Sequence, residues 1–408
     1  MRFLLLALLT WTVPTYGAEA FWPGWLGPNR DGWVGTFKAP KTWPAKLQTA
    51  WRIKVGEGYG TPLVIGDRVF QHARLGEKEV VWALDLKTGR KVWQTYFETP
   101  FKIGGGGEKH GKGPKANPAY ANGRLFVMSI AGRLSALDAA EGKVLWRADY
   151  DSKFQPSHPR WGMCNSPVVD ANRVIAHFGN DESGLLAAFD VRSGKEIWTQ
   201  GNDLPSYSSP TVVTHKGIRQ VIEWNRRALV GVNVKTGNLL WEYPFPRVGT
   251  NQNMPTPAFY QGKVLLGGEN RGLHGIEPKL ENGKWTVSSY WSNRKVSLDM
   301  ATAIVNDGRL YGLSHLSRGR IFCADSHTGE ILWQSPERTA DNATFLAFSG
   351  YIMVLLNKGE LRVVKADADR YEQVAAWQVA DTPTWAAPVL LQHGVLIKDR
   401  DHLTFWTF

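Results

Sequence analysis

Fourteen residues of this chain have side chains that could bind a ligand or take part in acid–base chemistry. Imidazoles can transfer protons or hold a metal, carboxylates and amides supply oxygen ligands, and arginines and tryptophans bind anions and planar groups. The candidates are His72, His158, Arg160, Trp161, His177, Glu223, Trp224, Asn225, Arg226, Glu269, Asn270, Arg271, His315 and Asp399. Because the set carries both charge signs, it favours a polar ligand or a peptide.

The sequence has none of the usual catalytic or metal-binding signatures. It contains no His-x-x-x-His, no Cys-x-x-Cys and no Gly-x-Ser-x-Gly motif. Glu223, Asn225 and Asp399 are of the types that bind calcium, but nothing in the sequence brings them together. We therefore assign no catalytic residue and no metal site from the sequence. Each candidate could also be a hydrogen-bonded loop anchor.

The elements that must position these residues belong to a repeat. In residues 82–93 an apolar run ends at Asp85, turn residues lead to Gly89, and Trp93 follows that glycine by four positions. The same spacing returns at four later pairs: Gly142 and Trp146, Gly194 and Trp198, Gly237 and Trp241, and Gly329 and Trp333. A unit that recurs every 40 to 55 residues predicts a repeat architecture in which each copy packs on its neighbours.

Counting the copies predicts a closed ring. Seven tryptophans close successive copies, namely Trp93, Trp146, Trp198, Trp241, Trp291, Trp333 and Trp377. Eight small residues open them: Thr61, Asn117, Ser166, Ser209, Thr256, Thr302, Thr344 and Ala387. The last copy has only three strands, and residues 49–55 resemble a closing strand with Trp51 as the eighth tryptophan. We predict an all-β, eight-bladed β-propeller of four-stranded antiparallel blades over residues 49–408, closed by an N-terminal strand that joins the last blade.

The blade topology indicates which face to inspect for function. If the strands of a blade are named A to D from the axis outwards, the D-to-A and B-to-C loops share one face, called the loop face. The short A-to-B and C-to-D turns share the opposite face, called the turn face. The small opening residues are expected because eight inner strands crowd the axis. We predict that the fourteen candidates surround the channel mouth on the loop face.

The longest D-to-A loop covers residues 94–116 and includes the glycine-rich stretch 102–112. Gly106 and Gly111–Lys112 come close to a phosphate-binding loop. However, Gly113 occupies the position where Ser or Thr must hold magnesium, and no helix is expected to follow. We interpret the stretch as a mobile basic flap over the loop face.

Composition and the N-terminal region indicate an exported protein. Residues 1–20 have one arginine, a short apolar run and an Ala18-Glu19-Ala20 cleavage site, which is typical of a secretory signal peptide. No cysteine lies near that site, so lipid attachment is not expected. Residues 21–48 are expected to form a lead arm packed on the propeller. We predict a periplasmic or secreted monomer without a transmembrane segment.

The net charge indicates which kinds of partner to expect, and the positions of the two cysteines indicate whether they form a disulfide. The formal net charge is +11 among 408 residues, but Lys and Arg are scattered, so we expect a solvated basic surface and no nucleic-acid partner. Cys164 and Cys323 fall at different positions in distant copies. We therefore expect two buried thiols and no disulfide.

The repeat unit resembles the tryptophan-docking motif of PQQ-like repeat propellers, a family that includes quinoprotein dehydrogenases and the BamB assembly factors. Its small residue six positions before the glycine is Ala83, Ala136, Ala188, Gly231 or Cys323. The resemblance covers residues 50–408 and implies that Trp51 and the seven closing tryptophans each stack between their own blade and the next. Copy five inserts residues before Trp291, and copy seven has residues 367–370 in place of a turn glycine, so looser docking is expected there.

The resemblance implies two functions, and a third stays open. A BamB-like member would bind a protein, peptide or polysaccharide on the loop face without a cofactor, and this is the interpretation we favour. A quinoprotein oxidoreductase would hold PQQ with calcium above the channel beside a catalytic Asp, although the disulfide between adjacent cysteines of those dehydrogenases has no counterpart here. The third is another enzyme at the channel mouth, around His158, Arg160, His177 and Glu223.

Overall fold

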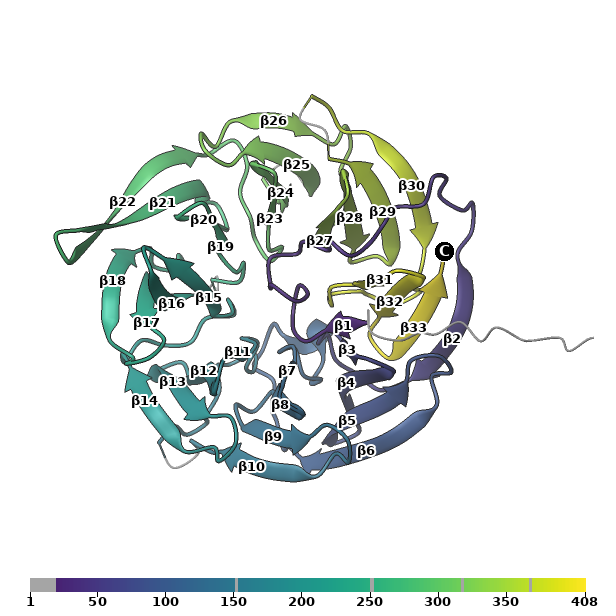
Figure 1. Cartoon of the computed structure of the whole chain (residues 1–408), viewed down its shortest axis with the longest axis horizontal. Helices are drawn as coiled ribbons and strands as arrows, with labels where there is room; N and C mark the ends of the chain where they lie inside the picture. The colour runs from purple at the N-terminus through teal and green to yellow at the C-terminus, as the bar shows by residue number, and fades with distance from the viewer. Residues whose placement is uncertain (1–19, 151–152, 250–252, 317–318, 367–368) are drawn as a thin grey trace, which may run out of the picture.

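The computed structural model describes residues 20–408 except 151–152, 250–252, 317–318 and 367–368, and it shows eight antiparallel sheets set around a central channel (Figure 1). Each sheet is one blade. The eight-bladed propeller predicted from the repeat count is therefore confirmed. The predicted signal peptide lies outside the described residues, apart from Ala20.

The first four blades follow the chain in order, from the channel outwards. Blade 1 consists of β3 (Leu63–Ile65), β4 (Arg68–Leu75), β5 (Lys78–Asp85) and β6 (Lys91–Glu98). Blade 2 consists of β7 (Ala119–Ala121), β8 (Arg124–Met128), β9 (Leu134–Asp138) and β10 (Val144–Ala148). Blade 3 consists of β11 (Val168–Asp170), β12 (Arg173–Gly179), β13 (Gly184–Asp190) and β14 (Glu196–Gln200). Blade 4 consists of β15 (Thr211–His215), β16 (Ile218–Trp224), β17 (Ala228–Asn233) and β18 (Leu239–Pro244).

The remaining blades complete the circle. Blade 5 consists of β19 (Ala258–Tyr260), β20 (Lys263–Gly268), β21 (Gly272–Glu281) and β22 (Lys284–Asn293). Blade 6 consists of β23 (Ile304–Asn306), β24 (Arg309–Ser314), β25 (Arg320–Asp325) and β26 (Ile331–Gln334). Blade 7 consists of β27 (Ala343–Phe348), β28 (Tyr351–Leu356), β29 (Glu360–Lys365) and β30 (Gln373–Gln378). Blade 8 consists of β31 (Val389–Leu391), β32 (Gly394–Lys398), β33 (His402–Thr407) and the N-terminal β2 (Gln48–Lys54).

Blade 8 closes the ring as the sequence predicts. Strand β2 pairs antiparallel with β33, and Trp51 lies opposite Phe405. The N-terminal and C-terminal strands of the propeller therefore share one sheet, and their pairing closes the ring.

The closing tryptophans explain the spacing of the repeat. The Trp51 indole donates a hydrogen bond to the Leu86 carbonyl at 2.8 Å, in the C-to-D turn of blade 1. Its ring packs on Gly89, where an added Cβ would lie 2.7 Å from the indole. The same contact to the next blade is made by Trp93, Trp146, Trp198 and Trp291.

Two tryptophans depart from the implied docking on the next blade. Trp241 donates to Gln220 of its own blade at 2.8 Å, because the long β21–β22 hairpin of blade 5 replaces the standard turn. Trp377 donates to the Pro44 carbonyl of the lead arm at 3.0 Å. The expectation of irregular docking at blade 5 is thus confirmed, whereas the arm contact was not foreseen.

The small opening residues do more than avoid crowding. The backbone N–H of each donates to the side chain of the next one, from Ala387 to Thr61, Asn117, Ser166, Ser209, Thr256 and Thr302, at 2.7–3.1 Å. This belt of hydrogen bonds joins blade 8 through blades 1–6 around the channel. It explains why hydroxyl and amide residues, and not only glycine or alanine, occupy these positions.

The lead arm lies against the inner strands at the turn face. Strand β1 (Phe21–Trp22) adds to β3 of blade 1, and the Val34 N–H donates to the Ala347 carbonyl of blade 7 at 2.8 Å. Between these anchors Arg30 enters the channel, and its guanidinium donates to the Pro167 and Pro210 carbonyls at 3.0 and 3.4 Å. Burial lowers the pKa of Arg30 to about 10. The arm therefore crosses the channel from blade 1 to blade 7.

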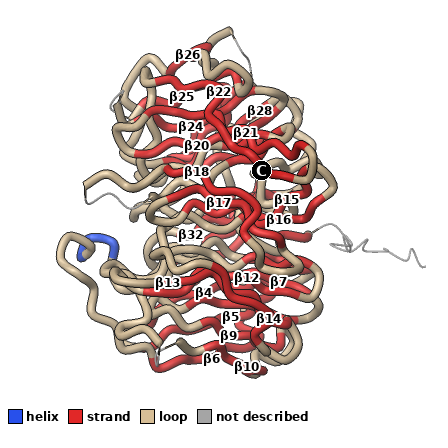
Figure 2. Tube along the Cα trace, turned by 90° about the vertical axis from the view of Figure 1, so that its left-hand side faces the viewer, coloured by secondary structure: helices blue, strands red, loops and turns tan. Residues whose placement is uncertain are grey.

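The propeller contains no apolar helix long enough for a bilayer within the described residues. Only one short helix occurs there, the 3-10 turn η1 (Glu108–His110), and Figure 2 shows it on a loop that projects from one face of the ring. This loop belongs to the predicted flap.

Candidate functional site

The fourteen sequence candidates lie mostly between neighbouring blades and not at the channel mouth. Strand B is the second strand from the axis, so its exit lies one strand further out than the mouth. His72 shows the pattern: its Nε2 lies 3.1 Å from Glu79 Oε2, and Glu79 Oε1 accepts the Ile130 N–H of blade 2 at 2.9 Å. Both side chains are buried. This pair connects blades 1 and 2.

His177 forms an equivalent connection between blades 3 and 4. Its Nδ1 lies 2.6 Å from Glu223 Oε1, and its Nε2 lies 2.9 Å from the Asp203 carbonyl. Burial alone would lower the pKa of His177, but the Glu223 carboxylate outweighs burial and raises it. Because both ring nitrogens have protein partners, the pair is a structural connection between blades.

Blades 4 and 5 hold a second group of candidates. Arg271 lies over the Trp224 ring at 4.9 Å and donates to the Asn253 side chain at 2.8 Å. Burial lowers the pKa of Arg271 to about 10. Trp224 is fully buried and donates to the Phe245 carbonyl at 3.0 Å. These residues pack the two blades together.

The other loop candidates either connect neighbouring blades or anchor local turns. Arg226 pairs with Asp181 at 2.6 Å, Asn225 accepts the Ala228 N–H at 2.9 Å, and His315 Nε2 lies 3.1 Å from Asn270 Oδ1. Asp399 is buried and accepts backbone N–H groups of Asp401 and His402 at 2.9 and 2.7 Å. Glu269 is partly buried in the same B-to-C turn as Asn270. No three metal-binding side chains converge among the residues that the structure describes.

Three candidates belong to the second long loop, at residues 158–161. His158 lies with its ring 4.9 Å from Phe101 and lines a cavity of about 220 Å³ that also includes His72 and Glu79. The Arg160 carbonyl accepts the Gly104 N–H at 2.8 Å, and the Trp161 indole donates to the Gly105 carbonyl at 3.2 Å. The second long loop thus holds the flap in place.

The channel mouth on the loop face is a separate cavity of about 380 Å³, called the mouth chamber. Its wall contains one residue from every blade junction, and each lies two positions before a small opening residue. These eight residues, called the mouth ring, are Tyr59, Lys115, Cys164, Tyr207, Met254, Met300, Asn342 and Trp385. Of the fourteen candidates, only Trp161 lines this chamber.

The flap and the arm close the mouth chamber from two sides. Ile103, Gly107, Lys109 and His110 of the flap contribute to its lining, and Trp25 of the lead arm contributes from the channel side. The His110 ring lies 4.9 Å from the Trp385 ring. Burial, with help from Lys109 and Lys115, lowers the pKa of His110 to about 4, so this imidazole is neutral at physiological pH.

Lys115 is the single charged member of the mouth ring. Its ammonium group donates only at long range, to the Gly111 carbonyl at 3.4 Å and the Trp161 carbonyl at 3.3 Å. Burial lowers the pKa of Lys115 and raises that of the nearby Cys164 thiol to about 11. Cys164 is only partly buried, which corrects the expectation of two buried thiols, because it faces the chamber. Cys164 and Cys323 form no disulfide, as expected.

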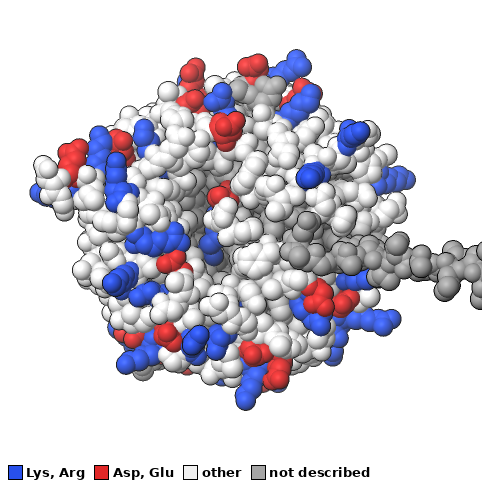
Figure 3. Space-filling view, viewed as in Figure 1, with Lys and Arg blue, Asp and Glu red and all other residues white. Residues whose placement is uncertain are grey.

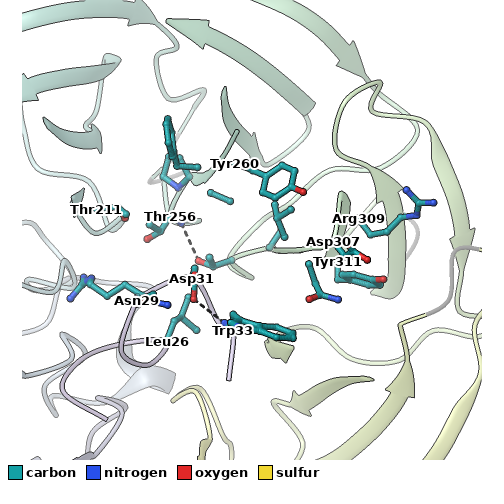
Figure 4. A pocket seen from close by; sticks show the side chains of 18 of the residues that line it. Leu26, Asn29, Asp31, Trp33, Thr211, Thr256, Tyr260, Asp307, Arg309 and Tyr311 are labelled. Atoms are coloured by element: carbon teal, nitrogen blue, oxygen red, sulfur yellow. Dashed lines mark hydrogen bonds between the residues drawn. The ribbon is translucent and has the colours of Figure 1, made fainter. Parts of the chain in front are cut away.

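A larger cavity of about 770 Å³ opens on the turn face, beside the arm. Figure 3 shows a hollow at the centre of this face, with charged groups scattered around its rim. Figure 4 shows that Asn29, Asp31 and Trp33 enter it from the arm, whereas Tyr260 and Asp307 come from blades 5 and 6. Asp31 accepts the Trp33 N–H at 2.9 Å. The arm therefore separates two cavities that share the channel.

The lining of the mouth chamber decides whether PQQ with calcium could bind there. Calcium requires several oxygen ligands, usually including carboxylates, and the described residues that line the chamber include no Asp or Glu. The same lining offers no carboxylate as a catalytic base. Lys109 and Lys115 instead make the chamber cationic. The residues present therefore do not fit a calcium-held quinone.

Comparison with known proteins places the chain in a family. The family model described as outer membrane protein assembly factor BamB matches residues 48–108 and 102–335. The chain belongs to this family. The BamB protein of Yersinia pestis is 25% identical over 369 residues, 86% of each chain. The solved BamB structure from Moraxella catarrhalis superimposes with a TM-score of 0.64 at 16% identity, covering 89% of this chain and 98% of that one.

Quinoprotein alcohol dehydrogenases are also similar to the chain, over a share that varies from one enzyme to the next. Quinohemoprotein alcohol dehydrogenase ADH-IIG of Pseudomonas putida is 28% identical over 159 residues, which is 38% of this chain but only 21% of the dehydrogenase. The resemblance to PQQ-like repeat propellers is thus confirmed, because both BamB proteins and quinoprotein dehydrogenases are similar to the chain. Another dehydrogenase, from Acetobacter aceti, aligns over 64% of this chain, and the solved Pseudomonas putida ADH-IIG superimposes on 95% of it with a TM-score of 0.70 at 14% identity, so the dehydrogenases share the whole propeller fold.

Sequence reasoning missed the mouth ring, although a signal for it was present. The small opening residues were identified in every copy, and the mouth ring lies two positions before each of them. An extended segment places alternate residues on the same side, so the position before the belt should also face the axis. The eight residues share no chemical type, and the repeat spacing therefore did not draw attention to them.

Proposed function

We propose that this chain is a non-catalytic binding module of the cell envelope, which holds a polypeptide partner on its loop face during assembly of outer-membrane proteins. The observation that carries the proposal is the length of the alignment with BamB: it covers 86% of this chain and 86% of the Yersinia pestis protein. The dehydrogenase match leaves about four-fifths of that enzyme without a counterpart in the alignment.

The loop face offers a suitable surface for a partner. Its two long D-to-A loops, the flap and residues 158–161, contact each other through the Gly104–Arg160 and Gly105–Trp161 hydrogen bonds. The turn face has short turns except at the long β21–β22 hairpin of blade 5 and where the arm lies. Irregular loops held by a rigid scaffold are the usual location of recognition. An export route to the periplasm is the corresponding proposal for localisation.

Site-specific photo-crosslinking in cells tests this proposal. A benzophenone amino acid replaces Lys109, an exposed flap residue, and in a matched control it replaces Glu141, an exposed residue of a turn-face loop. We expect polypeptide adducts from position 109 and few from position 141. Equal labelling from both faces, or none from either, would contradict a loop-face binding module. Reduction of a dye by the purified protein with added PQQ and calcium would favour the oxidoreductase instead.

A further inference from the structure

The mouth chamber contains polar groups that the protein itself does not use. The Tyr207 hydroxyl and the Asn342 side-chain oxygen are buried, and neither has a hydrogen-bond partner among the described residues. Both residues belong to the mouth ring. Unsatisfied buried polar atoms are uncommon in folded proteins and are frequent where a ligand binds. Because both atoms are shielded from solvent, an occupant of the chamber reaches them only when the side chains rotate towards it.

The charge of the chamber selects an anion. Lys115 has two weak carbonyl contacts, and its ammonium group carries three N–H donors, so one donor stays available. The exposed Lys109 adds a second positive charge at the flap. The described lining has no carboxylate, and the nearby Glu57 and Glu79 offset only part of the burial that lowers the pKa of Lys115. A partly desolvated ammonium group is strongly stabilised by an anionic partner brought to it. A carboxylate would provide such a partner.

The walls of the chamber select a planar apolar body. Trp161 and Trp385 present indole rings, with the Trp161 and Tyr207 rings 6.2 Å apart, and Met254 and Met300 complete the apolar wall. Methionine and aromatic side chains make favourable contacts with ring systems. A volume of about 380 Å³ accommodates a body of one or two fused rings and its carboxylate.

We infer that the mouth chamber binds a carboxylate attached to a one- or two-ring aromatic group, and that it does so without a metal. Lys115 receives the carboxylate, the Tyr207 hydroxyl adds a hydrogen bond, and the indole rings enclose the aromatic group. This is a different recognition mode from the calcium-held quinone of the quinoprotein resemblance, because a lysine of the protein takes the role of the cation. The inference does not depend on the proposed function, since a cavity ligand and a loop-face partner are detected separately.

Calorimetric titration of the full-length mature protein tests the inference. The probe is indole-3-acetate in the presence of EDTA, and the matched neutral probe is indole-3-acetamide. We expect the acid to bind at least tenfold more tightly than the amide. Equal affinities, binding of neither compound, or a requirement for calcium would overturn the inference. This comparison uses only the wild-type protein, so it does not depend on how well a variant folds.

Two lysine variants identify the residue that recognises the charge. Lys115→Met removes the ammonium group inside the chamber, and Lys102→Met removes an exposed lysine of the same loop that does not line the chamber. We expect Lys115→Met to abolish the difference between acid and amide, and Lys102→Met to preserve it. An unchanged preference in a folded Lys115→Met protein would overturn the assignment of Lys115.

Peptide probes distinguish the two sources of such a group. A short peptide that ends in tryptophan with a free carboxylate is compared with the same peptide amidated at its end. Preferential binding of the free peptide supports recognition of a polypeptide C-terminus in the chamber. Binding of indole-3-acetate but of neither peptide supports a free small molecule. Failure of all four probes, the two anionic and the two neutral ones, would overturn the inference, while photo-crosslinking from the flap would still test the proposed function.

Discussion

The Thr61 hydroxyl of blade 1 accepts a hydrogen bond from the Ala387 N–H of blade 8 at 3.1 Å, across the junction where the ring closes. Thr61 is fully buried, and its own N–H donates to Asn117 of blade 2 at 2.7 Å. One side chain thus connects the last blade to the first, and its backbone continues the belt to the second. The closure of the ring depends on this residue as well as on the shared sheet.

Replacement of this hydroxyl should weaken the closure. Thr61→Val keeps the shape of the side chain but leaves the buried Ala387 N–H without its acceptor, and this should lower the free energy of unfolding by about 1–3 kcal/mol. Urea denaturation followed by circular dichroism provides the measurement. Thr199→Val, at an exposed outer-strand position, is the control and should change stability by less than about 0.5 kcal/mol. Equal effects of the two substitutions would show that the belt does not stabilise the ring.

The glycine under Trp51 allows a second prediction. Gly89 has a φ of +68°, and an added Cβ would lie 2.7 Å from the Trp51 indole. Gly76 has a φ of +60° with no atom within 4 Å of its added Cβ, so it reports the backbone cost alone. Gly76→Ala should cost about 1 kcal/mol, and Gly89→Ala should cost at least about 2 kcal/mol because the indole must also move. The difference in unfolding free energy between the two variants measures the docking contact; a difference near zero would contradict its role.

The fold could be predicted because its signals are set by local geometry. A positive-φ glycine and a tryptophan four positions later have to recur wherever one blade docks on the next, so their spacing reveals the repeat. Trp51 at the start and the three-strand final copy then required closure by β2. The residues inserted in copy five gave a sign of the irregular docking of Trp241, whereas the contact of Trp377 depends on the arm, about which the spacing of the repeat contains no information.

The candidate site could be predicted only in part, for a related reason. The choice of the loop face followed from topology, but the candidates were selected by residue type at the exits of strand B. Those exits lie at blade junctions, where His177 and Glu223 satisfy each other. Lys115 and Tyr207 lie in D-to-A loops, and their positions depend on how the flap and the second long loop meet. That meeting involves loops far apart in sequence, and no repeat pattern encodes it.

The buried His177–Glu223 pair predicts a pH dependence of stability. The pKa of His177 is raised above its usual value near 6.5 in the folded state, so the folded protein binds a proton more readily than the unfolded chain. The stabilising contribution is therefore fully present below pH 6.5 and is lost as the pH rises through the raised pKa. Urea titrations between pH 5.5 and 8.5 should show this decline. Glu223→Gln should flatten it, and an unchanged decline in that variant would assign the titration to another group.

The contact between the two long loops predicts how fast the backbone amides of the flap exchange. The Trp161 indole donates to the Gly105 carbonyl at 3.2 Å, and the Trp161 ring packs within 2.9 Å of the Cβ position of Gly107. Trp161→Ala removes both the hydrogen bond and the packing, so amide exchange in residues 103–112 should accelerate at least tenfold in hydrogen–deuterium exchange. Trp161→Phe keeps part of the packing and should have an intermediate effect. Exchange in β5 of blade 1 provides the internal control, because this strand is hydrogen-bonded to β4 and β6 on both sides. If both variants exchange like the wild type, contacts other than those of Trp161 hold the flap over the mouth chamber.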